Sequence, residues 1–79
     1  HHRITREELS VREYMSQVLK TLHPPPPLPL ADLFQPEKGG TVLVVTFIAL
    51  LELAKETLIE ITQAEAFAPI YVRLAYTPV

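Results

Sequence analysis

One stretch, Thr41–Glu56 (TVLVVTFIALLELAKE), constrains the fold of this chain more than any other. Its spacing predicts an α-helix of about four turns. On a helical projection four of its polar side chains fall within one narrow arc: Thr41, Glu52, Lys55 and Glu56. The fifth, Thr46, lies well outside this arc. The apolar arc that remains is far wider than the ~100° stripe with which a surface helix covers one core.

This apolar arc divides into two adjoining sides. We expect the first to face the core of the domain; it carries Val42, Leu43, Thr46, Ala49, Leu50 and Leu53. The second side carries Val44, Phe47, Ile48 and Leu51. A small domain can cover one of these sides with its own chain, so the second side favours contact with a partner protein.

Length and composition limit what such a chain can be. A chain of 79 residues forms one small domain, or a fragment of a longer chain, and its core is marginal. It contains no cysteine, so neither a disulfide nor a thiolate metal site can support that core. Its apolar runs are far shorter than the ~20 residues of a membrane span, and no stretch has the pattern of a signal peptide.

A first helix is predicted from about Val11 to Leu22, after a lead-in at residues 1–9. Two capping-box patterns, TREE and SVRE, occur near its start, and the second is followed by an apolar pattern at helical spacing. The apolar positions are Val11, Met15, Val18, Leu19 and Leu22. This one-sided pattern is typical of a helix that packs on a core.

The run PPPPLP at residues 24–29 ends this helix, because prolines cannot continue it and favour the extended polyproline II form. We predict a stiff connector that leads into a short strand at Leu28–Leu30. The alternative is a docking ligand for a proline-reading groove, but such ligands usually lie in disordered tails rather than between ordered elements.

A hairpin is predicted after the long helix, because the apolar period changes to two. The strands are Leu58–Gln63 and Ile70–Tyr76, joined by a bend at Ala64–Pro69. In the first strand Ile59 and Ile61 share a face. In the second strand the inward face carries Ile70, Val72, Leu74 and Tyr76. We expect Phe67, in the bend, to fold back as an anchor.

The segment before the long helix is predicted to form one helical turn at Ala31–Phe34, with Leu33 and Phe34 as core anchors. A turn at Gln35–Gly40 follows it. The order is then helix, short strand, short helix, long helix and two-stranded hairpin. This is the order of a winged helix, a small α+β fold in which a three-helix core with a helix-turn-helix carries a β-hairpin wing.

No catalytic or metal-binding pattern accompanies this arrangement. No histidine pairs with an acidic residue at helical spacing, no Ser–His pair is apparent, and Gly39-Gly40 is an isolated turn pair. We therefore expect neither enzymatic activity nor a cofactor. Direct DNA binding is disfavoured too, because the net charge is -2 and the one basic residue of the long helix, Lys55, lies at its C-terminal end.

Three patterns occur together in this chain: SVRE at Ser10–Glu13, VTFIALLEL at Val45–Leu53, and QxxAFxxI at Gln63–Ile70. In this combination they resemble the C-terminal winged-helix domain of the bacterial kleisin family, segregation and condensation protein A. The similarity covers the chain from about His2 to Val72, and the proline run and Gly39-Gly40 lie outside the pattern.

This resemblance implies a kleisin subunit of a bacterial structural-maintenance-of-chromosomes (SMC) complex, cytoplasmic and nucleoid-associated, that condenses and segregates the chromosome. The chain would be the C-terminal fragment of a longer protein, and it would dock on an SMC ATPase head. A second accessory subunit (ScpB-like) would bind elsewhere in that longer protein. The docking residues implied on the long helix are Val44, Phe47, Ile48 and Leu51, with Tyr71 and Arg73 on the wing as weaker candidates.

Two other functions are compatible with the same sequence. In the first, the apolar face of the long helix forms a homodimer or binds another regulatory protein. In the second, which the charge distribution disfavours, the winged helix binds DNA. No membrane contact is expected in any of the three.

Overall fold

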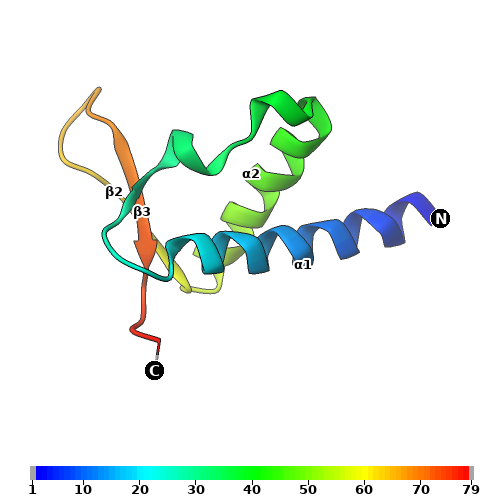
Figure 1. Ribbon diagram of the computed structural model, residues 1–79, viewed down its shortest axis with the longest axis horizontal. Coiled ribbons are helices and arrows are strands. Elements are labelled where there is room, and N and C mark those ends of the chain that lie inside the picture. Colours follow the sequence, from blue (N-terminus) through cyan, green and yellow to red (C-terminus); the bar gives the residue numbers. More distant parts are fainter. Residues whose placement is uncertain (1, 79) are drawn as a thin grey trace.

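The order of helices and strands in the computed structural model is that of a small winged helix (Figure 1). The structure describes the backbone of residues 2–78 and the side chains of residues 11–78. The elements are α1 (His2–Leu22), β1 (Leu28–Pro29), the 3-10 turns η1 (Leu30–Leu33) and η2 (Pro36–Lys38), α2 (Gly40–Lys55), β2 (Ile59–Gln63) and β3 (Ile70–Leu74). The predicted α+β class and winged-helix order are confirmed.

Within residues 2–78 the strands form one three-stranded antiparallel sheet in the order β1-β3-β2. Val72 of the central strand lies opposite Leu28 on one side and opposite Ile61 on the other. Pro29 is tolerated because β1 is an edge strand, where a missing backbone N–H breaks little of the ladder. In Figure 1 the sheet stands beside α2, and α1 crosses the lower end of α2 toward it.

The core lies where α1, η1, α2 and the sheet meet. Its buried residues are Val18, Leu22, Leu33, Leu50, Leu53, Ile59, Val72 and Leu74. On α2, the predicted core side is confirmed at Thr46, Ala49, Leu50 and Leu53. Val45 is buried as well, whereas Val42 and Leu43, in the first turns, are only half-buried. Of the two anchors expected before α2, Leu33 is buried and Phe34 packs partly buried against the core.

The C-terminus of α2 is closed by a Schellman motif without glycine. Thr57 has a φ of 59°, in the left-handed region. Its N–H donates to the carbonyl of Ala54 at 3.0 Å, and the N–H of Leu58 donates to the carbonyl of Leu53 at 2.9 Å. Leu58 then packs against the core, so the cap turns the chain from α2 directly into β2.

The start of α1 differs from the prediction. The helix begins at His2 rather than near Val11, so the lead-in expected at residues 1–9 is helical over its described part. Residues 3–10 contain neither glycine nor proline and are rich in Arg and Glu. A helix nucleated downstream therefore extends through them at low cost, and it passes through both capping-box patterns.

The wing differs from the prediction at two side chains. Phe67 does not fold back as an anchor but is fully exposed at the tip. Ile61 shares a face with Ile59, as predicted, and it is 46% exposed because β2 is an edge strand. Tyr76 lies beyond the end of β3 at Leu74 and is exposed rather than inward-facing. The other element bounds differ from the predicted ones by a residue or two, and η2 lies within the predicted turn.

Candidate protein-docking surface

One side of α2 is both apolar and open to solvent. Its four side chains are exposed to between 42% and 58%, and they are Val44, Phe47, Ile48 and Leu51. We call this set the α2 apolar face. All four were predicted as partner-binding residues, and the structure places them together on one side of the helix, away from the buried side formed by Val45, Ala49 and Leu53.

The α2 apolar face has the chemistry of a protein-binding surface. Aliphatic and aromatic side chains of this size each stabilise a complex by ~1.5–3 kcal/mol when they pass from water into an apolar pocket. Lys55 is the only basic side chain of α2, and it lies in the last turn. The other charged side chain is Glu52, also in the C-terminal half of α2, so the N-terminal part of the face, at Val44 and Phe47, has no charge to desolvate on binding.

Tyr71 and Arg73, the weaker predicted candidates, lie elsewhere. Side chains alternate along β3, so these two point to the outer face of the sheet while Val72 between them is buried. The guanidinium of Arg73 donates to the carboxylate of Glu60, its cross-strand neighbour. The structure thus divides the six predicted residues between two surfaces, the α2 apolar face and the outer face of the sheet.

An open groove lies next to Tyr71. It has a volume of about 600 Å³ and is bounded by the proline run on one side and the wing on the other, with lining residues Pro26, Pro27, Thr62, Gln63, Ala64, Ala68, Pro69 and Tyr71. This groove could not be predicted from the sequence, because it forms only when residues 26–27 come to lie beside the wing. Exposed prolines and a tyrosine make it a second apolar surface.

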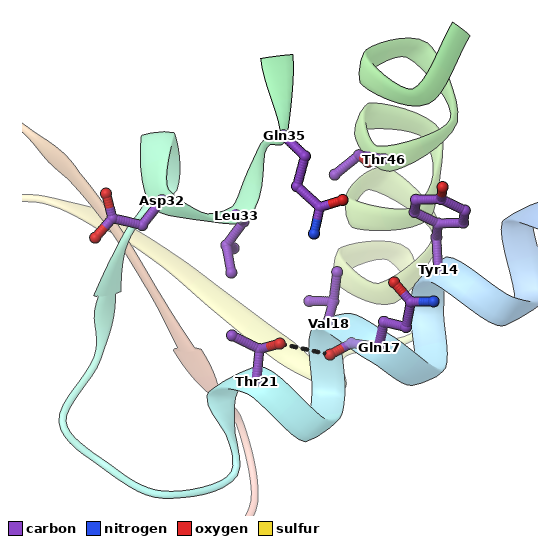
Figure 2. Close-up of a pocket in the computed structure, with 8 residues that line it drawn as sticks. All are labelled: Tyr14, Gln17, Val18, Thr21, Asp32, Leu33, Gln35 and Thr46. Carbon is purple, nitrogen blue, oxygen red and sulfur yellow. Dashed lines mark hydrogen bonds between the residues drawn. The ribbon is translucent and has the colours of Figure 1, made fainter. Parts of the chain in front are cut away.

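A small pocket lies between α1, η1 and α2 (Figure 2). Its volume is about 90 Å³, well below the ~300–1,000 Å³ of a typical ligand site. Figure 2 shows the side chain of Gln35 reaching into it from the link after η1, toward Gln17 and Tyr14 of α1. The Oε1 atom of Gln35 is buried, and no donor among the described residues bonds to it.

We expect Gln35→Met to stabilise the chain by about 1 kcal/mol, because it removes a buried acceptor and keeps the side-chain length. The melting temperature should rise by roughly 4–8 °C, as is usual for a domain of this size. A thermal melt followed by circular dichroism measures the shift. Arg12→Met, on the exposed side of α1 and outside the pocket, is the control and should change little. A lower melting temperature for Gln35→Met would show that Oε1 has a partner in solution.

The described residues offer little to other classes of function. Among them, no group of three or more His, Cys, Asp or Glu side chains is placed to hold a metal ion. None of the helices within residues 2–78 has both the length and the apolar character to cross a membrane. The N-terminal turns of α2, the part that reads DNA in many winged helices, carry only glycine, threonine and aliphatic residues.

The sequence of the whole winged helix matches a known family model. Residues 1–75 match the model described as segregation and condensation protein ScpA. The chain belongs to this family. The resemblance predicted from SVRE, VTFIALLEL and QxxAFxxI is thereby confirmed, since the match covers all three patterns.

Members of the segregation and condensation protein A family from distant bacteria are similar to this chain. The Xylella fastidiosa (strain 9a5c) protein is 44% identical over 72 residues, which cover 91% of this chain and 24% of that protein. The Coxiella burnetii protein is 44% identical over 72 residues, covering 91% and 27%. The Listeria monocytogenes (strain HCC23) protein is 48% identical over 75 residues, covering 92% and 30%. The chain therefore spans about a quarter of the length of these relatives.

Proposed function

We propose that this chain is the C-terminal winged-helix domain of a bacterial kleisin and that it docks on the ATPase head of an SMC protein. The kleisin would act without catalysis, as a structural subunit in chromosome condensation and segregation. Two findings support this proposal: the membership in the segregation and condensation protein A family, and the α2 apolar face.

The observation that carries the proposal is the position of Phe47 and Leu51. They lie one turn apart at the centre of the α2 apolar face, and each is 53% exposed. Neither side chain contributes to the core, so the fold does not account for them. Two such anchors can dominate an interface, because a few central apolar side chains usually carry most of the binding energy.

The other partners of the complex would bind outside the α2 apolar face. An ScpB-like accessory subunit would bind parts of the longer protein outside these residues. DNA would be held by the rest of the complex, since Arg73 is paired with Glu60 and α2 presents only Lys55. The protein would be associated with the chromosome, in the cytoplasm and at the nucleoid.

Titration of this chain with the purified SMC ATPase head of the same organism, by calorimetry, tests the proposal. We expect one-to-one binding with a negative heat-capacity change, since the interface buries apolar surface. A chain that gives no heat with the head, at concentrations where it is folded and monomeric, would contradict docking on the head.

A second candidate function is self-association through the α2 apolar face, because exposed apolar side chains also favour a homodimer. Sedimentation of the chain alone distinguishes the two. A dimer of the chain that persists when the head is added would favour self-association. Conversion of the free chain into a one-to-one complex with the head supports docking.

A further inference from the structure

The α2 apolar face is too small to form a stable interface alone. Large apolar side chains each have ~150–250 Å² of surface, so four half-exposed ones supply roughly 300–500 Å². A stable interface buries ~800 Å² on each partner. If the chain docks as proposed above, on which this inference rests, the contact must extend beyond α2 over other exposed apolar side chains.

Two exposed apolar side chains, Ile61 and Phe67, lie along the chain as it leaves α2, and one, Tyr71, lies on the other side of the sheet. Ile61 is on the face of β2 that is turned toward the helices, because it shares that face with the buried Ile59. Phe67 follows at the wing tip. Tyr71 is on the outer face of the sheet. A partner surface centred on α2 cannot contact both the inner and the outer face of the sheet without bending around an edge strand, so Tyr71 is left out of this interface.

Phe67 occupies a backbone position that disfavours it. The N–H of Ala68 donates to the carbonyl of Glu65 at 3.0 Å, which closes a β-turn with Phe67 as its third residue. The φ of Phe67 is 69°, in the left-handed region, and that of Ala66 is not positive, so the turn is of type II. Glycine or asparagine normally takes this position, because a Cβ atom there is strained.

The turn is also braced from the strand. The side-chain amide of Gln63 donates to the carbonyl of Ala68 at 2.8 Å, across the base of the tip. Gln63 and Ile70 form the last pair of the β2–β3 ladder, so the turn is held directly on the sheet. A rigid turn of this kind presents Phe67 in one defined place, which lowers the entropy lost on binding.

The fold gives Phe67 no compensation for its strain. Thr57, the other non-glycine residue with positive φ among those described, closes the Schellman cap and directs Leu58 into the core. Phe67 is 102% exposed and packs on nothing. A strained position occupied by a large apolar side chain that stabilises nothing in the domain points to a function outside it.

We propose that the wing tip is a second docking element, in which Phe67 inserts into an apolar pocket on the same SMC head that covers the α2 apolar face. Ile61 lies between the two elements along the chain, and the proposed contact includes its exposed side chain. The other tip residues are alanines, Pro69 and Glu65, so the pocket that receives the ring is apolar and carries no acidic side chain at its rim.

The test compares four forms of the chain in titrations with the purified head of the same organism: wild type, Phe67→Asn, Phe67→Tyr and Tyr76→Ala. Asparagine accepts the left-handed conformation, so Phe67→Asn removes the ring without disturbing the turn. We expect Phe67→Asn to weaken binding by about tenfold or more and to melt no lower than wild type. Phe67→Tyr keeps the ring and should bind like wild type, as should Tyr76→Ala, which removes an exposed ring beyond the end of β3.

Each other result overturns the inference. If Phe67→Asn binds the head as tightly as wild type while Leu51→Arg does not bind, the chain docks on the head through α2 and the wing tip takes no part. A loss in Tyr76→Ala instead would move the contact from the wing tip to the segment after β3. A lowered melting temperature for Phe67→Asn would mean that the ring packs on the domain. Failure of the wild type to bind rejects the proposed function itself.

Discussion

Leu51→Arg should abolish binding to the SMC head and leave the chain folded. In the free chain Leu51 is 53% exposed, so a longer charged side chain can reach solvent without entering the core. In the complex the same guanidinium would be buried without a partner, which costs several kcal/mol and lowers the affinity at least about a hundredfold. Calorimetry with the head measures the loss, and far-ultraviolet circular dichroism reports the fold.

Gln17→Arg is the matched control for this variant. It introduces the same charge on the exposed side of α1, away from the α2 apolar face, and should leave the affinity unchanged. Equal binding by Leu51→Arg and wild type would remove α2 from the interface. Unfolding of Leu51→Arg would instead place Leu51 in the core.

Leu53→Ala should have the largest effect on stability, a loss of about 2–5 kcal/mol, because it leaves a cavity where the side chain is completely buried. A domain of this size has a total stability of only about 4–12 kcal/mol, so this variant should be partly unfolded at 37 °C. Urea denaturation followed by circular dichroism gives the free energy of unfolding.

The comparison for this variant lies two positions away on the same helix. Leu51→Ala makes the identical chemical change at a half-exposed position, and we expect it to cost less than about 1 kcal/mol. A similar loss at both leucines would mean that α2 is buried on both sides, and the α2 apolar face would then not exist in solution.

Most of the fold could be predicted from the sequence because its signals are local. The period of the apolar residues separates the buried side of α2 at Ala49 and Leu53 from the exposed side at Phe47 and Leu51. That separation required only the helical repeat, since a small domain has too little chain to cover both sides. The strand pattern of the wing was predicted for the same reason.

The errors arose where a property depends on neighbours distant in sequence or on backbone torsion. The exposure of Ile61 could not be predicted either, because it depends on the strand order that makes β2 an edge. Phe67 looked like an anchor by its hydrophobicity alone, whereas the type II turn holds it away from the core. The predicted start of α1 is wrong because the second capping-box pattern, SVRE, is not the end of the helix: residues 3–10 before it contain no helix breaker, and the helix continues through them.

The strand order has a consequence for synthesis on the ribosome. The central strand, β3, is made after β1 and β2, and it is the only strand that pairs with both of them within the described residues. Until Leu74 has left the exit tunnel, neither β1 nor β2 has a partner, and the inner side of α2 lacks the cover of Val72 and Leu74. Until β3 pairs, only α1 and the 3-10 turns cover the inner side of α2, so a nascent chain exposes part of that side together with the α2 apolar face and needs protection from aggregation.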